Sequence, residues 1–323
     1  YFEILRKNLS GTLGKNLLNL EFPLSAEGEG TPHELLMKLR ATRLTDDELL
    51  DTFYDQIIES YDYVGNFLIL LIHDAYDIPG RTSDGIEMED ASDEVYSYIL
   101  CSICPVDLSK PGLSYNEIES NFQNRIRDWV VGMPEWGFLF PAFNDRSTDL
   151  HSTLLYTRKS EDLHDSVVER ILGCPLPLPA GSQKESFQAI IADTLGDACD
   201  YETVKTIHEN LNELISEHKD DPEPVVLDKY QVKTLLENSG VEEEQLENFD
   251  QNFDETAGER ASIYASNIAS TRAFEVKTPD VVVKVNPERT DLVETREIDG
   301  RQCLVITIDG GIEVNGILVN QNG

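Results

Sequence analysis

The chain has 323 residues, 40% of them hydrophobic, and its 26 basic and 61 acidic side chains give a formal net charge of −35. A chain of this length can bury a core divided among roughly one to three domains. The negative charge repels nucleic acids and anionic membranes, because both are polyanions. Composition therefore favours a highly soluble protein, and it leaves open a binder of basic partners.

Cysteine usage and hydropathy indicate the cytoplasm. No apolar run approaches the roughly 20 residues that a membrane span needs, and no secretory signal is present. Five cysteines, an odd number without regular spacing, favour reduced thiols in a reducing compartment. The chain begins with Tyr1 rather than Met, and Phe2, Leu5 and Leu9 already have helical spacing. We therefore expect the natural protein to contain residues before Tyr1.

The first 64 residues have the apolar spacing of helices. The segment Thr45–Glu48 predicts a capping box, in which the Thr hydroxyl and the Glu carboxylate accept hydrogen bonds from amides at a helix start. The residues after it place an apolar stripe on one helix face, namely Leu49, Leu50, Phe53, Ile57 and Ile58.

A series of strands is predicted next. Unbroken or nearly unbroken apolar runs bounded by turn residues favour buried strands, here Phe67–Ile72, Val95–Val106, Phe138–Phe143 and Leu150–Thr157. Between them we expect a long turn at Asp77–Gly85, a loop at Leu108–Tyr115 and a short amphipathic helix that ends at Ile126. The connections are short, which favours an antiparallel or mixed sheet.

Helical spacing returns from Glu161. Ser182–Glu185 predicts a capping box ahead of one helix, and Asp200 predicts the N-cap of the next. A helix–glycine–helix unit follows around Gly240, and its second helix contains no Lys or Arg from Val241 to Gly258. Such a helix would meet phosphate repulsion on DNA, so we interpret this unit as a packing or protein-contact element.

The C-terminal part predicts strands at Val281–Val285, Thr290–Ile298 and Arg301–Ile308, with a two-residue hairpin turn at Asp299–Gly300. The resulting fold class is α+β: N-terminal helices with an antiparallel or mixed sheet, a helical middle and a C-terminal β-hairpin. The predicted regions are 1–160, 161–270 and 271–323, with the last packing back on the rest and with one continuous domain as the alternative.

The pair Cys101 and Cys104 has the spacing of a metal or redox motif. A zinc site needs about four ligands, and no second Cys-x-x-Cys pair is present to complete one. A redox pair normally opens a helix, whereas this pair lies in a predicted strand with its side chains on opposite faces. We therefore predict two buried core residues, no metal site and no cofactor.

The densest polar cluster lies at Asn144, Asp145, Arg146, Asp149 and His151. Arg146 could clamp a carboxylate or phosphate, and Asp145, Asp149 and His151 could act as acid or base. The Gly-x-Ser-x-Gly turn of serine hydrolases is missing, so no catalytic residue is assigned. The five residues are candidate ligand-binding residues. The alternative is a turn in which Asn and Asp side chains bond backbone amides.

Four segments resemble a bacterial family named domain of unknown function 4317, namely Leu9–Asn19, Phe138–Asp149, Ala180–Phe187 and Val285–Arg296. The resemblance spans essentially the whole chain, and members of that family typically have an additional N-terminal segment. It implies no activity and no functional residue. In the order of its elements alone, the chain is also similar to the bacterial 37-kDa nucleoid-associated protein family, and a shared fold would not establish a shared function.

The leading hypothesis is a non-enzymatic nucleoid-associated or protein-interaction role, because the residues present no convincing catalytic set. The alternative is an enzyme or small-ligand binder that uses the cluster from Asn144 to His151. A third hypothesis is an acidic protein that occupies a partner's nucleic-acid groove. The expected partners are a protein or the nucleoid but no membrane, and a homo-oligomer is also open because exposed strand edges need cover.

Overall fold

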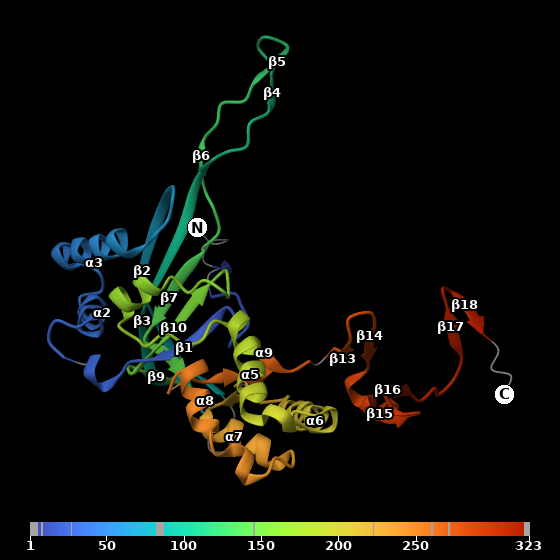
Figure 1. Ribbon diagram of the computed structural model, residues 1–323. Coiled ribbons are helices and arrows are strands. Elements are labelled where there is room, and N and C mark those ends of the chain that lie inside the picture. Colours follow the sequence, from blue (N-terminus) through green and yellow to red (C-terminus); the bar gives the residue numbers. More distant parts are fainter. Residues whose placement is uncertain are drawn as a thin grey trace. The chain divides into compact units, whose positions relative to one another are not determined.

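The computed structural model describes residues 6–7, 9–26, 28–81, 87–144, 146–221, 223–259, 261–270 and 272–319. The chain divides into two compact units, Tyr1–Gly181 and Ser182–Gly323, which we describe separately. Both units contain helices and strands, and every pair of strands in the described ranges is antiparallel (Figure 1). The predicted α+β class is confirmed.

Unit 1 is built on one antiparallel sheet. The strand order is β1–β10–β7–β3–β2, and β6 pairs with β3 near and beyond the first residue of β2. The strands are β1 (Leu17–Glu21), β2 (Asn66–Arg81), β3 (Glu87–Leu108), β6 (Trp129–Val131), β7 (Trp136–Phe140) and β10 (Ser152–Thr157). The helices of this unit are η1 (Leu24–Ala26), α2 (Pro32–Ala41), α3 (Asp47–Ser60), α4 (Asp165–Val167) and the π-helical turn η2 (Val168–Leu172).

The core of unit 1 lies where α2 and α3 cover one face of this sheet. Alternate residues of a strand share a face, so Trp136, Phe138 and Phe140 of β7 point to the same side, and all three are fully buried. The ring centroid of Phe53 in α3 lies 6.3 Å from that of Phe138, and the ring of His33 in α2 lies 5.5 Å from Phe140. Aromatic packing therefore joins both helices to β7.

The cysteine pair lies in β3, and both side chains are completely buried. Burial raises the pKa of both thiols, that of Cys104 to about 11. Within the described residues, no three His, Cys, Asp or Glu side chains are grouped so that they could hold a metal ion. The interpretation of Cys101 and Cys104 as buried core residues is confirmed.

The helical prediction for residues 1–64 is wrong in one segment and displaced in another. Residues 17–21 form β1, which pairs with β10 and buries Leu18 and Leu20. The N-cap of α3 is Asp46, whose carboxylate accepts from the amides of Glu48 and Leu49 at 3.1 and 3.2 Å. Thr45, the predicted cap, instead donates its hydroxyl to a carbonyl of the preceding turn.

Two predictions in the middle of unit 1 are also wrong. The segment predicted as a long turn from Asp77 is strand as far as Arg81, where β2 ends; residues 82–86 lie outside the described residues. The segment predicted as a loop and a short helix is a hairpin of β4 (Leu113–Asn116) and β5 (Asn121–Asn124). Tyr115 and Phe122 face each other across it with ring centroids 5.3 Å apart, a pair that a strand geometry favours.

Unit 2 begins with a helical layer. Its elements are α5 (Ala180–Leu195), η3 (Gly196–Ala198), α6 (Tyr201–Glu217), β11 (Val226–Leu227), α7 (Lys229–Asn238), η4 (Glu243–Leu246), α8 (Phe249–Thr256), β12 (Ile263–Tyr264) and α9 (Ala265–Ile268). Their apolar faces meet in a common core that contains Phe249 and Phe253, both fully buried. Asp200 caps α6 as predicted, accepting from the amide of Thr203 at 2.8 Å. Ser182 is not a cap, because α5 already begins at Ala180.

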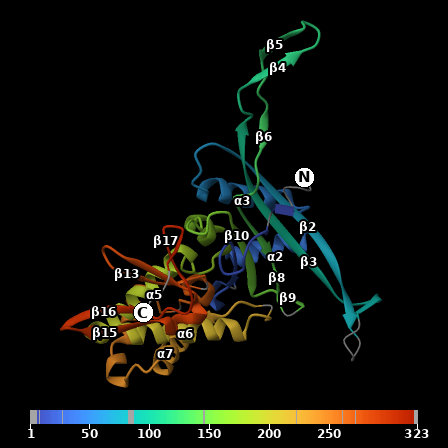
Figure 2. The ribbon, with the colours of Figure 1, turned by 90° about the vertical axis from the view of Figure 1, so that its right-hand side faces the viewer.

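The remainder of unit 2 consists of hairpins and one helical turn. They are β13 (Phe274–Lys277) with β14 (Val282–Val285), η5 (Pro287–Leu292), β15 (Val293–Ile298) with β16 (Arg301–Ile306), and β17 (Ile312–Val314) with β18 (Ile317–Val319). Figure 2 shows β15 and β16 side by side. Their turn, Asp299–Gly300, has positive φ angles of 51° and 73°, as the hairpin prediction requires.

Candidate functional site

The polar cluster predicted at Asn144 to His151 belongs to a tight hairpin in unit 1. The strands β8 (Ala142–Asn144) and β9 (Ser147–Asp149) pair so that Asn144 faces Ser147, which leaves a two-residue turn. Arg146 in that turn has a φ of 61°, and Asp145 lies outside the described residues. The cluster is therefore local in origin: the turn brings neighbouring residues together.

Hydrogen bonds inside the hairpin engage both carboxylate oxygens of Asp149. The side-chain amide of Asn144 donates to Oδ2 at 2.8 Å, and the backbone amide of His151 donates to Oδ1 at 3.0 Å. Burial opposes ionisation of Asp149, but bonds from Ser152, Asn144 and the His151 amide outweigh it and hold the pKa of Asp149 below its ordinary value. Asn144 and Asp149 thereby close the hairpin.

Ligand binding by Asn144, Asp145, Arg146, Asp149 and His151 stays a prediction. The geometry gives Asn144 and Asp149 a structural task that accounts for their polarity. The side chains of Arg146 and His151 belong to residues that already have interaction partners in the protein. A ligand would have to compete with these contacts.

Asp149→Ala is expected to lower the free energy of unfolding of unit 1 by about 1–2 kcal/mol at neutral pH, because it removes charge-assisted hydrogen bonds. The folded-state pKa is depressed, so this stabilisation is present above the unfolded pKa of about 3.9 and is lost as the pH falls through the folded pKa. Urea unfolding at neutral and acidic pH measures it. The exposed Asp51 of α3 provides the control, since Asp51→Ala should leave stability nearly unchanged.

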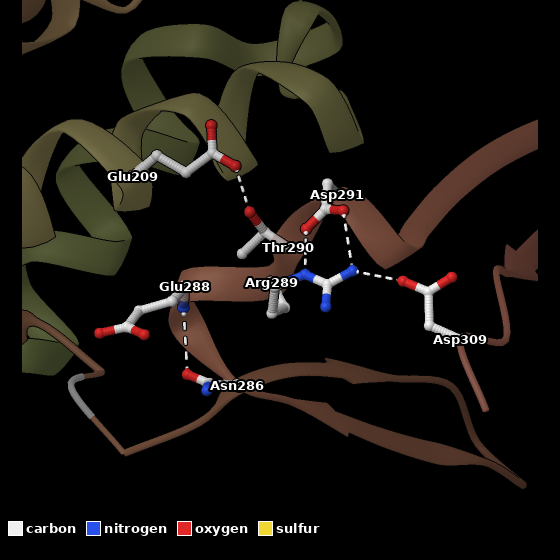
Figure 3. Close-up of polar contacts among 7 residues, drawn as sticks. All are labelled: Glu209, Asn286, Glu288, Arg289, Thr290, Asp291 and Asp309. Carbon is white, nitrogen blue, oxygen red and sulfur yellow. Dashed lines mark hydrogen bonds and ion pairs between the residues drawn. The ribbon is translucent and has the colours of Figure 1, made fainter. Parts of the chain in front are cut away.

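A second polar cluster, which the sequence reading missed, surrounds Arg289 in η5 (Figure 3). The guanidinium donates to Asp291 at 3.1 Å and to Asp309 at 2.7 Å, while the adjacent Thr290 hydroxyl bonds the carboxylate of Glu209 in α6. The bonds from Arg289 lower the pKa of Asp291. Arg289 and Thr290 thus join η5 to two other segments of unit 2, and we interpret the cluster as structural.

An open cleft of about 840 Å³ lies between α2, α3 and η2 in unit 1. Charged side chains line it in pairs: Lys38 lies 2.8 Å from Glu34, and Arg170 lies 3.5 Å from Glu59. Because these cations are neutralised by neighbouring carboxylates, the cleft offers an anionic ligand little net attraction.

The most unusual feature of unit 1 is a projecting β-ribbon, residues 105–133, which we call the arm. It continues β3 and β7 past Asn66, the first residue of β2, and β4 and β5 lie at its far end (Figures 1 and 2). Backbone hydrogen bonds hold it together along its length: Gly132 to Pro105, Ser109 to Asp128 and Arg125 to Gly112, at 2.7–2.8 Å.

The arm carries a series of exposed apolar side chains. They are Leu108, Leu113, Tyr115, Ile118, Phe122, Ile126, Trp129, Val130, Val131 and Met133. Ile118 is 96% exposed, Phe122 64% and Trp129 61%. The sequence reading missed this surface, although the alternation of Leu113 and Tyr115 was a signal for a strand.

None of the described helices is long and apolar enough to cross a membrane.

Comparison with protein families confirms the principal resemblance. No curated protein matches the chain, and the comparisons give no support to the resemblance to the nucleoid-associated family. The model of the family described as "Domain of unknown function (DUF4317)" matches residues 1–317, and the chain therefore belongs to this family.

Proposed function

We propose that this protein has a non-enzymatic role in protein–protein interaction and that the arm is its docking element. The observation that carries the proposal is the exposure of ten apolar side chains on one two-stranded ribbon. A two-stranded ribbon is marginally stable alone in water, and exposed apolar groups add no stability until something covers them.

The size of the exposed surface supports this role. Ten side chains that each present on the order of 100 Å² correspond to about 1,000 Å², which the alternation of strand side chains divides between the two faces of the ribbon. Roughly 500 Å² on one face lies at the upper end of the 300–600 Å² that is typical of the largest apolar patch of a monomeric protein. Each partner in a standard protein–protein interface contributes about 800 Å². A partner that covers both faces of the arm would therefore bury enough apolar surface for an interface of standard size.

The charge of the arm favours a protein over the nucleoid as its partner. The arm, residues 105–133, has three basic and four acidic residues, so its net charge is −1, while that of the whole chain is −35. Binding to nucleic acid depends on basic residues that neutralise phosphates, and this arm supplies no excess of them. Apolar contact with a protein requires no excess of basic residues.

The test is site-specific photo-crosslinking of the full-length protein in cells. A photoreactive residue in place of Ile118 or Phe122 is expected to give adducts of defined mass with protein. Ile58 in α3 is the matched control, because it is apolar and 59% exposed but lies outside the arm. Ile126→Ser with Trp129→Ser should abolish the adducts. Labelling from the arm no stronger than from position 58 would overturn the proposal.

A further inference from the structure

We infer that the partner of the arm is a second copy of this chain, and that two arms pack antiparallel about a twofold axis. This inference rests on the proposed function, since it names the protein that covers the apolar side chains of the arm. Its evidence is the distribution of charge along the arm, which is independent of the apolar surface.

The charges of the arm are separated along its length. The turn between β4 and β5 contains Glu117 and Glu119 and no basic residue, and we call it the tip. The part nearer the sheet, the stem, contains three basic and two acidic residues: Lys110, Arg125, Arg127, Asp107 and Asp128. The tip therefore has a charge of two negative units and the stem a net charge of one positive unit.

These opposite charges lie too far apart to neutralise each other within one arm. Glu117 lies seven positions after Lys110, and a strand rises about 3.3 Å per residue, which gives roughly 23 Å. The Debye length at physiological ionic strength is about 8 Å, so this attraction is screened within the monomer. Among the described residues, Glu117, Glu119 and Arg125 form no ion pairs. Their opposite charges thus remain available to a partner.

In an antiparallel pair of arms, the attraction between an acidic tip and a basic stem occurs twice, once at each end of the pair. The acidic tip of each arm then lies beside the basic stem of the other, whereas a parallel pair would place like charges together. The apolar side chains between tip and stem meet their own equivalents, which is the self-complementary contact of a twofold interface. Such a contact closes at two copies and gives a dimer rather than a filament.

Charge also favours contact between two arms over contact between other surfaces of the two chains. Each chain has a net charge of −35, so general contact between the acidic surfaces is repulsive, whereas each arm has a net charge of only −1 and contact between two arms meets little of this repulsion. One face of each arm presents roughly 500 Å² of apolar surface, so two arms would bury about 1,000 Å² in total, which is the lower bound for a specific interface. A second copy is thus a partner that the arm can meet with little Coulombic repulsion.

The test is a charge exchange, read by sedimentation equilibrium of the full chain over a concentration series. The wild type is expected to be a dimer. Reversal of the tip (Glu117→Lys with Glu119→Lys) or of the stem (Lys110→Glu with Arg125→Glu) should raise the dissociation constant at least about tenfold, because each exchange makes tip and stem repel in both symmetric contacts. The variant with both exchanges restores opposite charges and should recover the dimer.

A monomeric wild type, or a dimer equally stable in all four proteins, would overturn the inference. A monomer whose arm still crosslinks to another protein refutes the twofold dimer and leaves the proposed function standing. Loss of crosslinking from the arm to any protein refutes both. Circular dichroism of the two exchanged variants checks that the fold is retained, and the variant with both exchanges distinguishes charge pairing from a general effect of net charge.

Discussion

Phe138→Ala is expected to lower the free energy of unfolding of unit 1 by about 3–5 kcal/mol, the loss typical when a buried phenylalanine leaves a cavity. Phe138 is fully buried at the centre of the helix-covered sheet face. Its ring lies 6.3 Å from Phe53 of α3 and 5.9 Å from Trp136, so the substitution removes the contact by which a helix is joined to β7.

Urea unfolding followed by tryptophan fluorescence measures this loss, because Trp136 is one of only two tryptophans in the chain and lies next to the cavity. Ile58→Ala is the control, since Ile58 is a large apolar residue of the same unit that is 59% exposed; its replacement should change stability by about 0.5 kcal/mol or less. Equal effects of the two substitutions would contradict the packing of α3 on β7.

Gln183→Leu is expected to destabilise unit 2 by about 1–3 kcal/mol, although leucine is apolar and similar in volume to glutamine. Gln183 in α5 is fully buried, and its side-chain oxygen accepts from the backbone amide of Tyr264 and from the side chain of Asn267, both at 2.9 Å. Leucine would leave these donors without that acceptor, and the cost of an unsatisfied buried donor exceeds the gain from burying an apolar side chain.

Hydrogen exchange at the Tyr264 amide gives a local readout of this effect, and exchange there should accelerate in the variant. Gln251 provides the matched control, because it is a glutamine on a helix of the same unit whose side chain is exposed and donates to Glu255. Gln251→Leu should leave both stability and Tyr264 exchange nearly unchanged. Slow exchange at Tyr264 in the Gln183 variant would show that its amide has another acceptor.

Several features could be predicted from the sequence because their causes are local. Asp200 caps α6 through bonds to amides within its own first turn. The turn at Asp299–Gly300 needs positive φ at both residues, which this residue pair tolerates well. Cys101 and Cys104 could be assigned to the core because the residues around them form a nearly continuous apolar run.

The candidate site was predictable only in part. The polar residues from Asn144 to His151 are adjacent in sequence, so any turn would bring them together. That Asn144 bonds Asp149 depends on the register of β8 and β9, which the composition of the segment does not determine. The same limit applies to Arg289, since its bond to Asp309 joins residues 20 positions apart.

By itself, the sequence determined the α+β class, the family and the helix and turn signals that act within a few residues. Only the tertiary structure decided that residues 17–21 are a strand and that residues 108–126 belong to an arm. The spacing of Ile118, Phe122 and Ile126 also fits a helix, and pairing between the neighbouring strands β4 and β5, such as that of Tyr115 with Phe122, overrode it. Strand pairing is a contact between two segments, so the apolar spacing within one segment does not report its energy.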